Sequence, residues 1–220
     1  KCDLLNNISH EVAPSNDFTI YDSPKAGSDA IRSWIFYAGS GIVHASIDHQ
    51  YLIGEGDTYQ ALQDFGYTDS KFVPTKSSTR IAMYRDPVER FISTFYYARV
   101  ANPMFTNTLD EFVDNFDGII ASCKHKIHTG QNYLEFLFAT QTYHLGSDKT
   151  FYTSTVPYRK FDNIKRYLEK VWGVGMPTLQ LPNTNEPCPF TGHVCEFDLT
   201  TRQKTKVNEI YAEDYENGWS

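Results

Sequence analysis

The feature that most constrains the fold is the change of pattern within residues 79–101, TRIAMYRDPVERFISTFYYARVA. A short apolar run ends at Tyr84, and from Pro87 onward apolar side chains recur at helical spacing, at Val88, Phe91, Ile92, Phe95 and Tyr96. Proline suits the first turn of a helix, where its missing N–H is not needed. The segment therefore predicts a strand over 79–84 that leads into a helix over 87–101.

A second segment of the same kind occupies residues 18–38. An apolar run over 18–22 predicts a strand, and the small residues Pro-Lys-Ala-Gly-Ser at 24–28 predict a turn. A helix over 28–38 follows, with one apolar face formed by Ile31, Trp34, Ile35 and Ala38. Strands that alternate with helices favour a parallel sheet flanked by helices, so we expect an α/β fold.

The remaining chain is expected to complete one domain over residues 1–220, since this length suffices for a single sizeable core. Residues 1–16 predict an irregular arm and residues 174–198 a surface loop. Thr108 with Glu111, and Thr200 with Gln203, are capping-box pairs that mark two helix starts. We expect further strands over 42–47 and 150–155, and further helices over 58–65, 109–116, 131–140, 161–171 and after Thr200.

Composition narrows the classes of function. The formal net charge is −7, which argues against general nucleic-acid binding, because such binding needs a basic face. No stretch approaches the ~20 apolar residues of a membrane-spanning helix. The chain opens with Lys1 rather than Met. We therefore expect the chain to be a piece of a longer protein. Whether an N-terminal membrane anchor lies outside this piece is left open.

The cysteines and histidines do not predict a metal site, because no C-x-x-C pair or zinc-finger spacing occurs. Cys188 and Cys195 flank a short loop, and two interpretations remain: a disulfide in an oxidising compartment, or two free thiols. Asn7-Ile8-Ser9 is a glycosylation sequon, which is weak support for a secretory route.

The turn at residues 24–28 has the features of an anion-binding site. A glycine-containing turn between a strand and a helix directs free backbone N–H groups at an anion. Lys25 adds a positive charge and Ser28 a hydroxyl. The order of a Walker A loop is absent, because Lys25 precedes the single Gly27. A purely structural turn is the alternative.

Arg85 and Ser93 form a second candidate site. Arg85 is expected where the strand gives way to the helix, and Ser93 about two turns into that helix. A guanidinium offers paired donors in a fixed geometry, and together with a hydroxyl it can hold one phosphate. The alternative is that Arg-Asp-Pro is simply a helix start.

Together the two motifs resemble the sulfotransferase superfamily, whose members use 3′-phosphoadenosine 5′-phosphosulfate (PAPS) as the sulfuryl donor. Residues 24–28 are similar to its 5′-phosphosulfate loop. The resemblance is closest to the Golgi carbohydrate enzymes, especially heparan and uronyl 2-O-sulfotransferases, in which Arg-Asp-Pro-(Ile/Val)-Glu-Arg precedes a Ser and a tyrosine-rich helix ending in Arg. The residues that repeat this design are Arg85, Asp86, Pro87, Glu89, Arg90, Ser93, Tyr96, Tyr97 and Arg99.

The resemblance implies a three-layer, P-loop-like fold with a mostly parallel central sheet, and PAPS as co-substrate without a metal. It implies that Lys25 stabilises charge on the bridging oxygen of the leaving group. Arg85 and Ser93 would bind the 3′-phosphate. The 5′-phosphate would be held by backbone N–H groups of Ala26, Gly27, Ser28 and Asp29. Arg159 and Lys160 lie in a region that resembles the family's third nucleotide-contacting segment, and Tyr158 is a candidate for stacking on adenine or for core packing.

Asp29 departs from the family pattern, which usually has Thr or Ser at this position. A carboxylate near a helix N-terminus stabilises the helix but would repel a phosphosulfate. Either Asp29 points away from the donor, or this loop binds its nucleotide differently.

A general base is needed to accept the proton of the acceptor hydroxyl. In the 2-O and 6-O glycan enzymes the base resembles a His followed by a small apolar residue and Ser or Asp, and His44-Ala45-Ser46 fits this pattern. His49 is the second candidate. The alternative to a histidine base is a carboxylate, which would be Asp48, Glu55 or Asp57.

The expected function is sulfuryl transfer from PAPS to a hydroxyl, on a carbohydrate acceptor, by in-line displacement. The resemblance implies the Golgi lumen if the source is eukaryotic, and the cytoplasm otherwise. Two alternatives remain: a P-loop-type kinase that uses ATP, and an inactive homologue that binds a nucleotide or a glycan without transfer.

Overall fold

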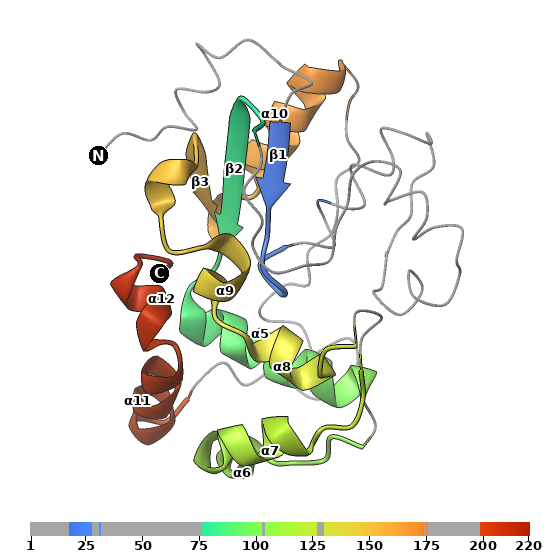
Figure 1. Cartoon of the computed structure of the whole chain (residues 1–220), viewed down its shortest axis with the longest axis vertical. Helices are drawn as coiled ribbons and strands as arrows, with labels where there is room; N and C mark the ends of the chain where they lie inside the picture. The colour runs from blue at the N-terminus through green and yellow to red at the C-terminus, as the bar shows by residue number, and fades with distance from the viewer. Residues whose placement is uncertain are drawn as a thin grey trace. The chain divides into compact units, whose positions relative to one another are not determined.

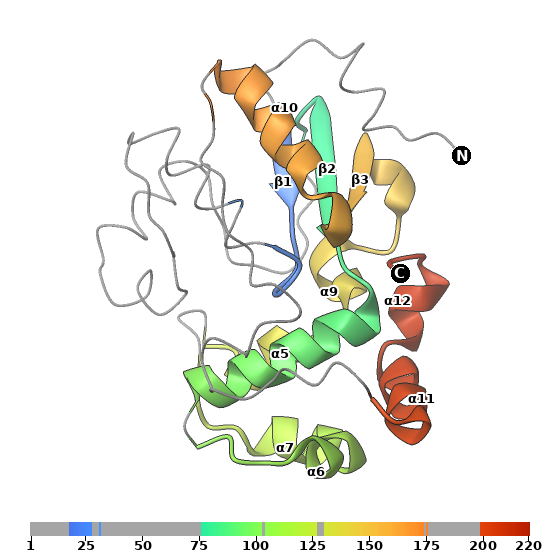
Figure 2. The same cartoon turned by 180° about the vertical axis from the view of Figure 1, so that it is seen from behind.

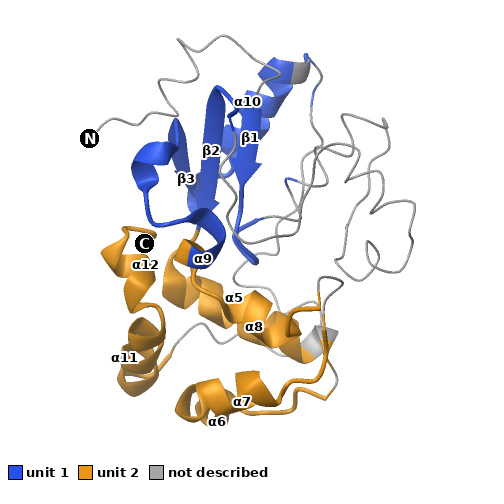
Figure 3. Ribbon diagram, in the orientation of Figure 1, with its two compact units in different colours: residues 1–84, 143–180 blue, residues 85–142, 181–220 orange. Residues whose placement is uncertain are grey.

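The computed structural model describes residues 18–27, 31, 76–102, 104–126, 130–173, 175 and 199–220. The chain falls into two compact units (Figure 3). Unit 1 comprises Lys1–Tyr84 and Tyr143–Gln180, and unit 2 comprises Arg85–Thr142 and Leu181–Ser220. The expectation of one domain over 1–220 stays a prediction.

Unit 1 contains a three-stranded parallel sheet in the order β1-β2-β3 (Figure 1). The strands are β1 (Phe18–Tyr21), β2 (Thr79–Tyr84) and β3 (Ser154–Pro157). Phe18 is in register with Thr79, and Ile81 with Ser154. The predicted strands over 18–22 and 79–84 and the α/β class are confirmed, while the P-loop-like arrangement stays a prediction.

The third strand begins later than the sequence predicts. Residues 149–151 form the 3-10 helix η1 (Lys149–Phe151) instead of extended chain. The carboxylate of Asp148 caps it by accepting a hydrogen bond of 2.9 Å from the Thr150 N–H. The predicted strand over 150–155 is therefore wrong at its start, because a local side-chain cap outweighs the β propensity of this run.

Helix α10 (Asp162–Trp172) covers one face of the sheet, as the reverse view shows (Figure 2). Its apolar side packs on alternate strand residues, and the shared cluster contains Ile81, Met83, Val156, Phe161, Ile164, Tyr167 and Leu168. The helix ends at Gly173, which adopts the left-handed conformation with φ of 65°. The predicted amphipathic helix over 161–171 and its stop are thus confirmed.

The opposite face of the sheet carries aromatic side chains from the segment before β3. The Tyr21 ring meets Phe151 and Tyr152 edge to face, with centroids 5.8 Å and 5.3 Å apart. Arg80 Nε donates to the Phe151 carbonyl at 2.6 Å. Both faces of the sheet are therefore packed within unit 1.

Unit 2 is helical. Its helices are α5 (Pro87–Ala101), α6 (Leu109–Asp114), α7 (Phe116–Ser122), α8 (Tyr133–Phe138), α11 (Thr201–Ile210) and α12 (Ala212–Glu216), while α9 (Gln141–Leu145) begins in this unit. The predicted helix over 87–101 is confirmed at both ends. Asp86 is its N-cap and accepts from the Glu89 N–H at 3.0 Å.

Phenylalanine rings form the core of unit 2. Phe112 lies at the centre, with ring centroids of Phe138, Phe105, Phe116 and Phe95 between 4.7 and 5.5 Å away. Offset and edge-to-face contacts of this kind add to the energy of area burial. The high aromatic content of the chain, 15%, is thus used here for packing.

Two helix starts carry the predicted capping boxes, Thr108 with Glu111 and Thr200 with Gln203. The predicted helix over 109–116 is wrong in its end, because Asn115 leaves the helical conformation (φ −129°, ψ 42°) and α7 begins after it. No helix in the described ranges is both long enough and apolar enough to cross a membrane.

Several predicted elements lie outside the described residues: the arm over 1–16, the strand over 42–47, the helix over 58–65 and the loop over 174–198, apart from Gly175. From the helix predicted over 28–38 only Ile31 is described. It is helical, and its N–H donates to the Gly27 carbonyl at 3.3 Å, which is the bond of a helix that follows the turn.

Candidate functional site

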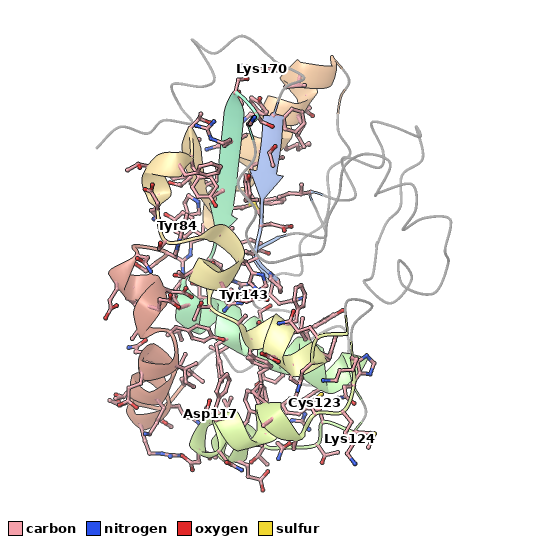
Figure 4. The ribbon with its side chains drawn as sticks, viewed as in Figure 1. Tyr84, Asp117, Cys123, Lys124, Tyr143 and Lys170 are labelled. Carbon is pink, nitrogen blue, oxygen red and sulfur yellow. The ribbon has the colours of Figure 1, made fainter. Side chains whose placement is uncertain are left out.

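The candidate site in unit 1 is the edge of the sheet where the parallel strands end. β1 leads into the turn that contains Lys25, and β3 leads into the 3-10 helix η2 (Tyr158–Lys160). β2 ends at Tyr84, which Figure 4 labels. Ligands of open parallel sheets bind outside the carboxyl ends of the strands. The topology therefore brings the Lys25 turn and η2 to the edge where such a ligand would bind.

The Lys25 turn is held in an unusual backbone conformation. Lys25 has φ of 63° and is the only non-glycine residue with positive φ in the described part of the chain. Gly27 has φ of 98°, and the Ala26 N–H donates to the Ser23 carbonyl at 3.1 Å. Non-glycine residues in the left-handed region are concentrated at ligand-binding positions. The half-buried lysine thus sits on a tight, defined turn.

The space beside Gly27 is occupied by side chains. A Cβ at this position would overlap the terminal methyl of Met83 and come within 3.3 Å of the Tyr158 ring. Met83 is fully buried, so its methyl has no room to move into solvent. The turn therefore packs tightly against the ends of β2 and β3.

We expect Gly27→Ala to lower the free energy of unfolding by about 2–4 kcal/mol. About 1 kcal/mol comes from the left-handed conformation and about 1–3 kcal/mol from overpacking. Gly173→Ala is the matched control, because Gly173 also has positive φ but nothing lies within 4 Å of the added Cβ. It should lose only about 1 kcal/mol. Urea unfolding checks both variants, and equal losses would show that the close packing at Gly27 is absent.

Two lysines lie near Tyr84, the last residue of β2. The ammonium of Lys149 lies 4.6 Å from the centre of the Tyr84 ring, and burial lowers the pKa of Lys149. Burial raises the pKa of Tyr84, and the charge of Lys160 opposes that rise. Arg159 is exposed on η2. Lys149 and Lys160 thus place positive charge beside the Tyr84 ring, in a chain whose net charge is −7.

Tyr158 lies between the turn and the core. Its ring stacks on Phe161 with centroids 6.1 Å apart and an interplanar angle of 21°. Its Cδ2 and Cε2 atoms border Gly27. These contacts agree with the core-packing interpretation of Tyr158, and they place one aromatic ring directly beside the Lys25 turn.

In unit 2, Arg85 lies between β2 and the start of α5 and is 9% exposed. Its Nε is 3.6 Å from a carboxylate oxygen of Glu89, one turn into α5. Its backbone is held by the side-chain amide of Gln141, which accepts from the Arg85 N–H at 2.8 Å and donates to the Arg85 carbonyl at 2.8 Å. Ser93 is half-buried on α5.

The second arginine of the motif has a structural role. Arg90 is fully buried and donates to the carbonyls of Leu137 at 3.3 Å and Ala139 at 2.6 Å, where α8 ends. Its guanidinium carbon lies 4.9 Å from the centre of the Tyr211 ring. It therefore caps α8 rather than facing a ligand. Tyr96 and Tyr97 likewise pack against the core cluster of unit 2.

The structure thus places Lys25, Ala26 and Gly27 together in one turn of unit 1, and it places Arg85 and Ser93 in unit 2. Four predicted site residues, Ser28, Asp29, His44 and His49, lie outside the described residues, as do Cys188 and Cys195. Cys123 is a free thiol. Across the described ranges, no three His, Cys, Asp or Glu side chains come together as a potential metal site.

Sequence reasoning did not find Lys149, Tyr84 or Gln141. The first two meet only because η1 precedes β3, and the amide of Gln141 reaches a residue 56 positions away. Comparison with known proteins gives no match to any family model, curated protein or solved structure.

Proposed function

We propose that this protein is a sulfotransferase that moves a sulfuryl group from PAPS to an acceptor hydroxyl, on a carbohydrate. The observation that carries the proposal is the turn after β1, in which a half-buried lysine with φ of 63° precedes a tightly packed glycine at the carboxyl edge of a parallel sheet. The motif resemblance at Arg85 and Ser93 supplies the choice of PAPS among nucleotides.

The residues of the turn suit an anionic donor. Backbone N–H groups in a strand-to-helix turn are donors for a phosphate. The prediction that the Ala26 N–H is one of them is wrong, because this N–H donates to the Ser23 carbonyl within the turn. The bond from Ile31 to Gly27 indicates that a helix follows. The ammonium of Lys25 would stabilise the charge that develops on the bridging oxygen as the bond to sulfur breaks. In that step PAPS supplies the sulfuryl group and adenosine 3′,5′-bisphosphate is released.

The acceptor oxygen forms the new bond to sulfur, and its proton must pass to a base. We assign this role to His44, with His49 as second candidate. His44→Ala should lower the rate of transfer by ~10²–10⁴-fold while the affinity for adenosine 3′,5′-bisphosphate is preserved. Steady-state transfer rates and calorimetric titration measure the two quantities. An unchanged rate would move the role to His49 or to a carboxylate.

Thermal shifts separate the proposed donor from ATP. Adenosine 3′,5′-bisphosphate should raise the melting temperature, and ATP with magnesium should not, because ligands stabilise only the state they bind. The reverse result would favour the kinase alternative.

We expect Arg85→Ala to weaken binding of adenosine 3′,5′-bisphosphate by about 10–100-fold, since hydrogen bonds to charged groups contribute about 1.5–3 kcal/mol. Affinity for adenosine 5′-phosphate, which lacks the 3′-phosphate, should not change. Arg166→Ala, an exposed arginine of α10, is the control. Calorimetric titration of both nucleotides measures the effect. If Arg85→Ala leaves both affinities unchanged, the assignment of the 3′-phosphate site is wrong.

A further inference from the structure

Gln141 makes an unusual set of contacts in unit 2. Its side chain is fully buried. The amide oxygen accepts from the Arg85 N–H at 2.8 Å, and the amide nitrogen donates to the Arg85 carbonyl at 2.8 Å and to the Trp219 carbonyl at 2.9 Å. One side chain therefore pairs both backbone groups of the residue to which we assign the 3′-phosphate.

Arg85 lies at the junction between β2 and α5, where neither the strand nor the helix holds its backbone. The register of β2 ends at Tyr84, and the first backbone bond of α5 is accepted by the Asp86 carbonyl. Backbone groups buried at such a junction need partners. The Gln141 amide forms hydrogen bonds with both the N–H and the carbonyl of Arg85. These bonds fix the backbone position from which the Arg85 side chain extends.

Gln141 is itself held in place by the C-terminal part of unit 2. Asp214, fully buried, accepts from the Gln141 N–H at 2.9 Å and from the Thr142 N–H at 2.8 Å, so it caps the start of α9. The Trp219 N–H donates to the Asp214 carbonyl at 2.7 Å. The Trp219 side chain is fully buried as well.

We infer that Gln141, held by Asp214 and Trp219, is a positioning residue that fixes Arg85 for recognition of the 3′-phosphate. The inference rests on the proposed function, because it assigns the specificity of that site to a buried tether. A shift of about 1 Å in a positioned group can lower its effect by ~10²-fold. The tether should therefore affect discrimination between nucleotides more than it affects binding in general.

The test uses Gln141→Met, which keeps the length of the side chain and removes its donor and acceptor atoms. The ratio of the dissociation constants of adenosine 5′-phosphate and adenosine 3′,5′-bisphosphate should fall by about 10-fold relative to the parent protein. Gln203→Met is the matched control. Gln203 is a second buried glutamine of unit 2, and its amide donates to Asp110 at 2.8 Å at the start of α11. This variant should keep the parent ratio.

A second readout is independent of any nucleotide. Hydrogen exchange at the Arg85 amide should become faster in Gln141→Met and stay unchanged in Gln203→Met, because only the first variant removes the acceptor of that amide. If Gln141→Met does not fold, Gln141→Glu keeps an acceptor for the Arg85 N–H and places an oxygen against the carbonyls of Arg85 and Trp219. It should also lower the nucleotide ratio.

The outcomes separate two failures. If the parent protein does not prefer adenosine 3′,5′-bisphosphate, the proposed function is wrong and the inference falls with it. If the parent shows the preference and the Gln141 variants keep it, the proposed function stands and only the positioning role of Gln141 is overturned.

Discussion

Lys25→Ala should lower the release of adenosine 3′,5′-bisphosphate from PAPS by about 10³-fold, the effect of removing one group that stabilises charge in a transition state. The lysine is the cation of a turn at the carboxyl edge of the parallel sheet, two residues before a glycine that packs against Met83 and Tyr158. Its ammonium is the group that we assign to the leaving oxygen. Chromatographic assay of nucleotide release, with water or a glycan as acceptor, measures the loss.

Two further variants distinguish a loss of catalysis from a loss of folding. Lys170→Ala removes a lysine that is exposed in the last turn of α10, labelled in Figure 4, and should keep the parent rate. Lys25→Gly suits the left-handed conformation at this position and should stay within about 1 kcal/mol of the parent free energy of unfolding while losing activity. Parent-like activity in Lys25→Gly would remove Lys25 from the proposed reaction.

Arg90→Met should lower the free energy of unfolding by about 3–5 kcal/mol, because it removes two hydrogen bonds from a buried charged donor, each worth about 1.5–3 kcal/mol. Arg90 is fully buried and donates to the Leu137 and Ala139 carbonyls at the end of α8. Burial raises the pKa of Asp214, and the charge of Arg90 opposes that rise. The variant leaves two carbonyls and a carboxylate without this cation.

The control for this prediction is Arg99→Met, an exposed arginine on the same helix, which should change the free energy of unfolding by only about 0.5 kcal/mol. Urea unfolding measures the parent protein and both variants. A loss below about 1 kcal/mol for Arg90→Met would contradict the structural role of Arg90.

The sequence predicted well those elements whose signals are local. The helix over 87–101 was predicted at both ends, because Asp86 and Pro87 define its start and its apolar face is regular. The two capping boxes and the stop of α10 at Gly173 are signals of the same kind. Parallel pairing followed from the alternation of strands and helices.

Errors arose where distant contacts or short caps decide the conformation. The start of β3 moved because Asp148 caps a 3-10 turn, and α12 was not predicted. Asp214 of α12 bonds to residues more than 70 positions away, so no local pattern marks it.

The same contrast between local patterns and distant contacts applies to the candidate site. The turn at Lys25 and the strand-to-helix junction at Arg85 were predicted from local patterns, and the described residues show a turn and a junction there. The contact of Gly27 with Tyr158 and the tether from Gln141 to Arg85 join residues far apart in the chain, so no local pattern marks them.

The most direct test of the proposed function is transfer of radioactive sulfur from labelled PAPS to a panel of desulfated glycans, with Lys25→Ala as the negative control. We predict label on a glycan with the parent protein and none above background with Lys25→Ala. Absence of label on every acceptor, together with intact binding of adenosine 3′,5′-bisphosphate, would contradict transfer and favour an inactive homologue.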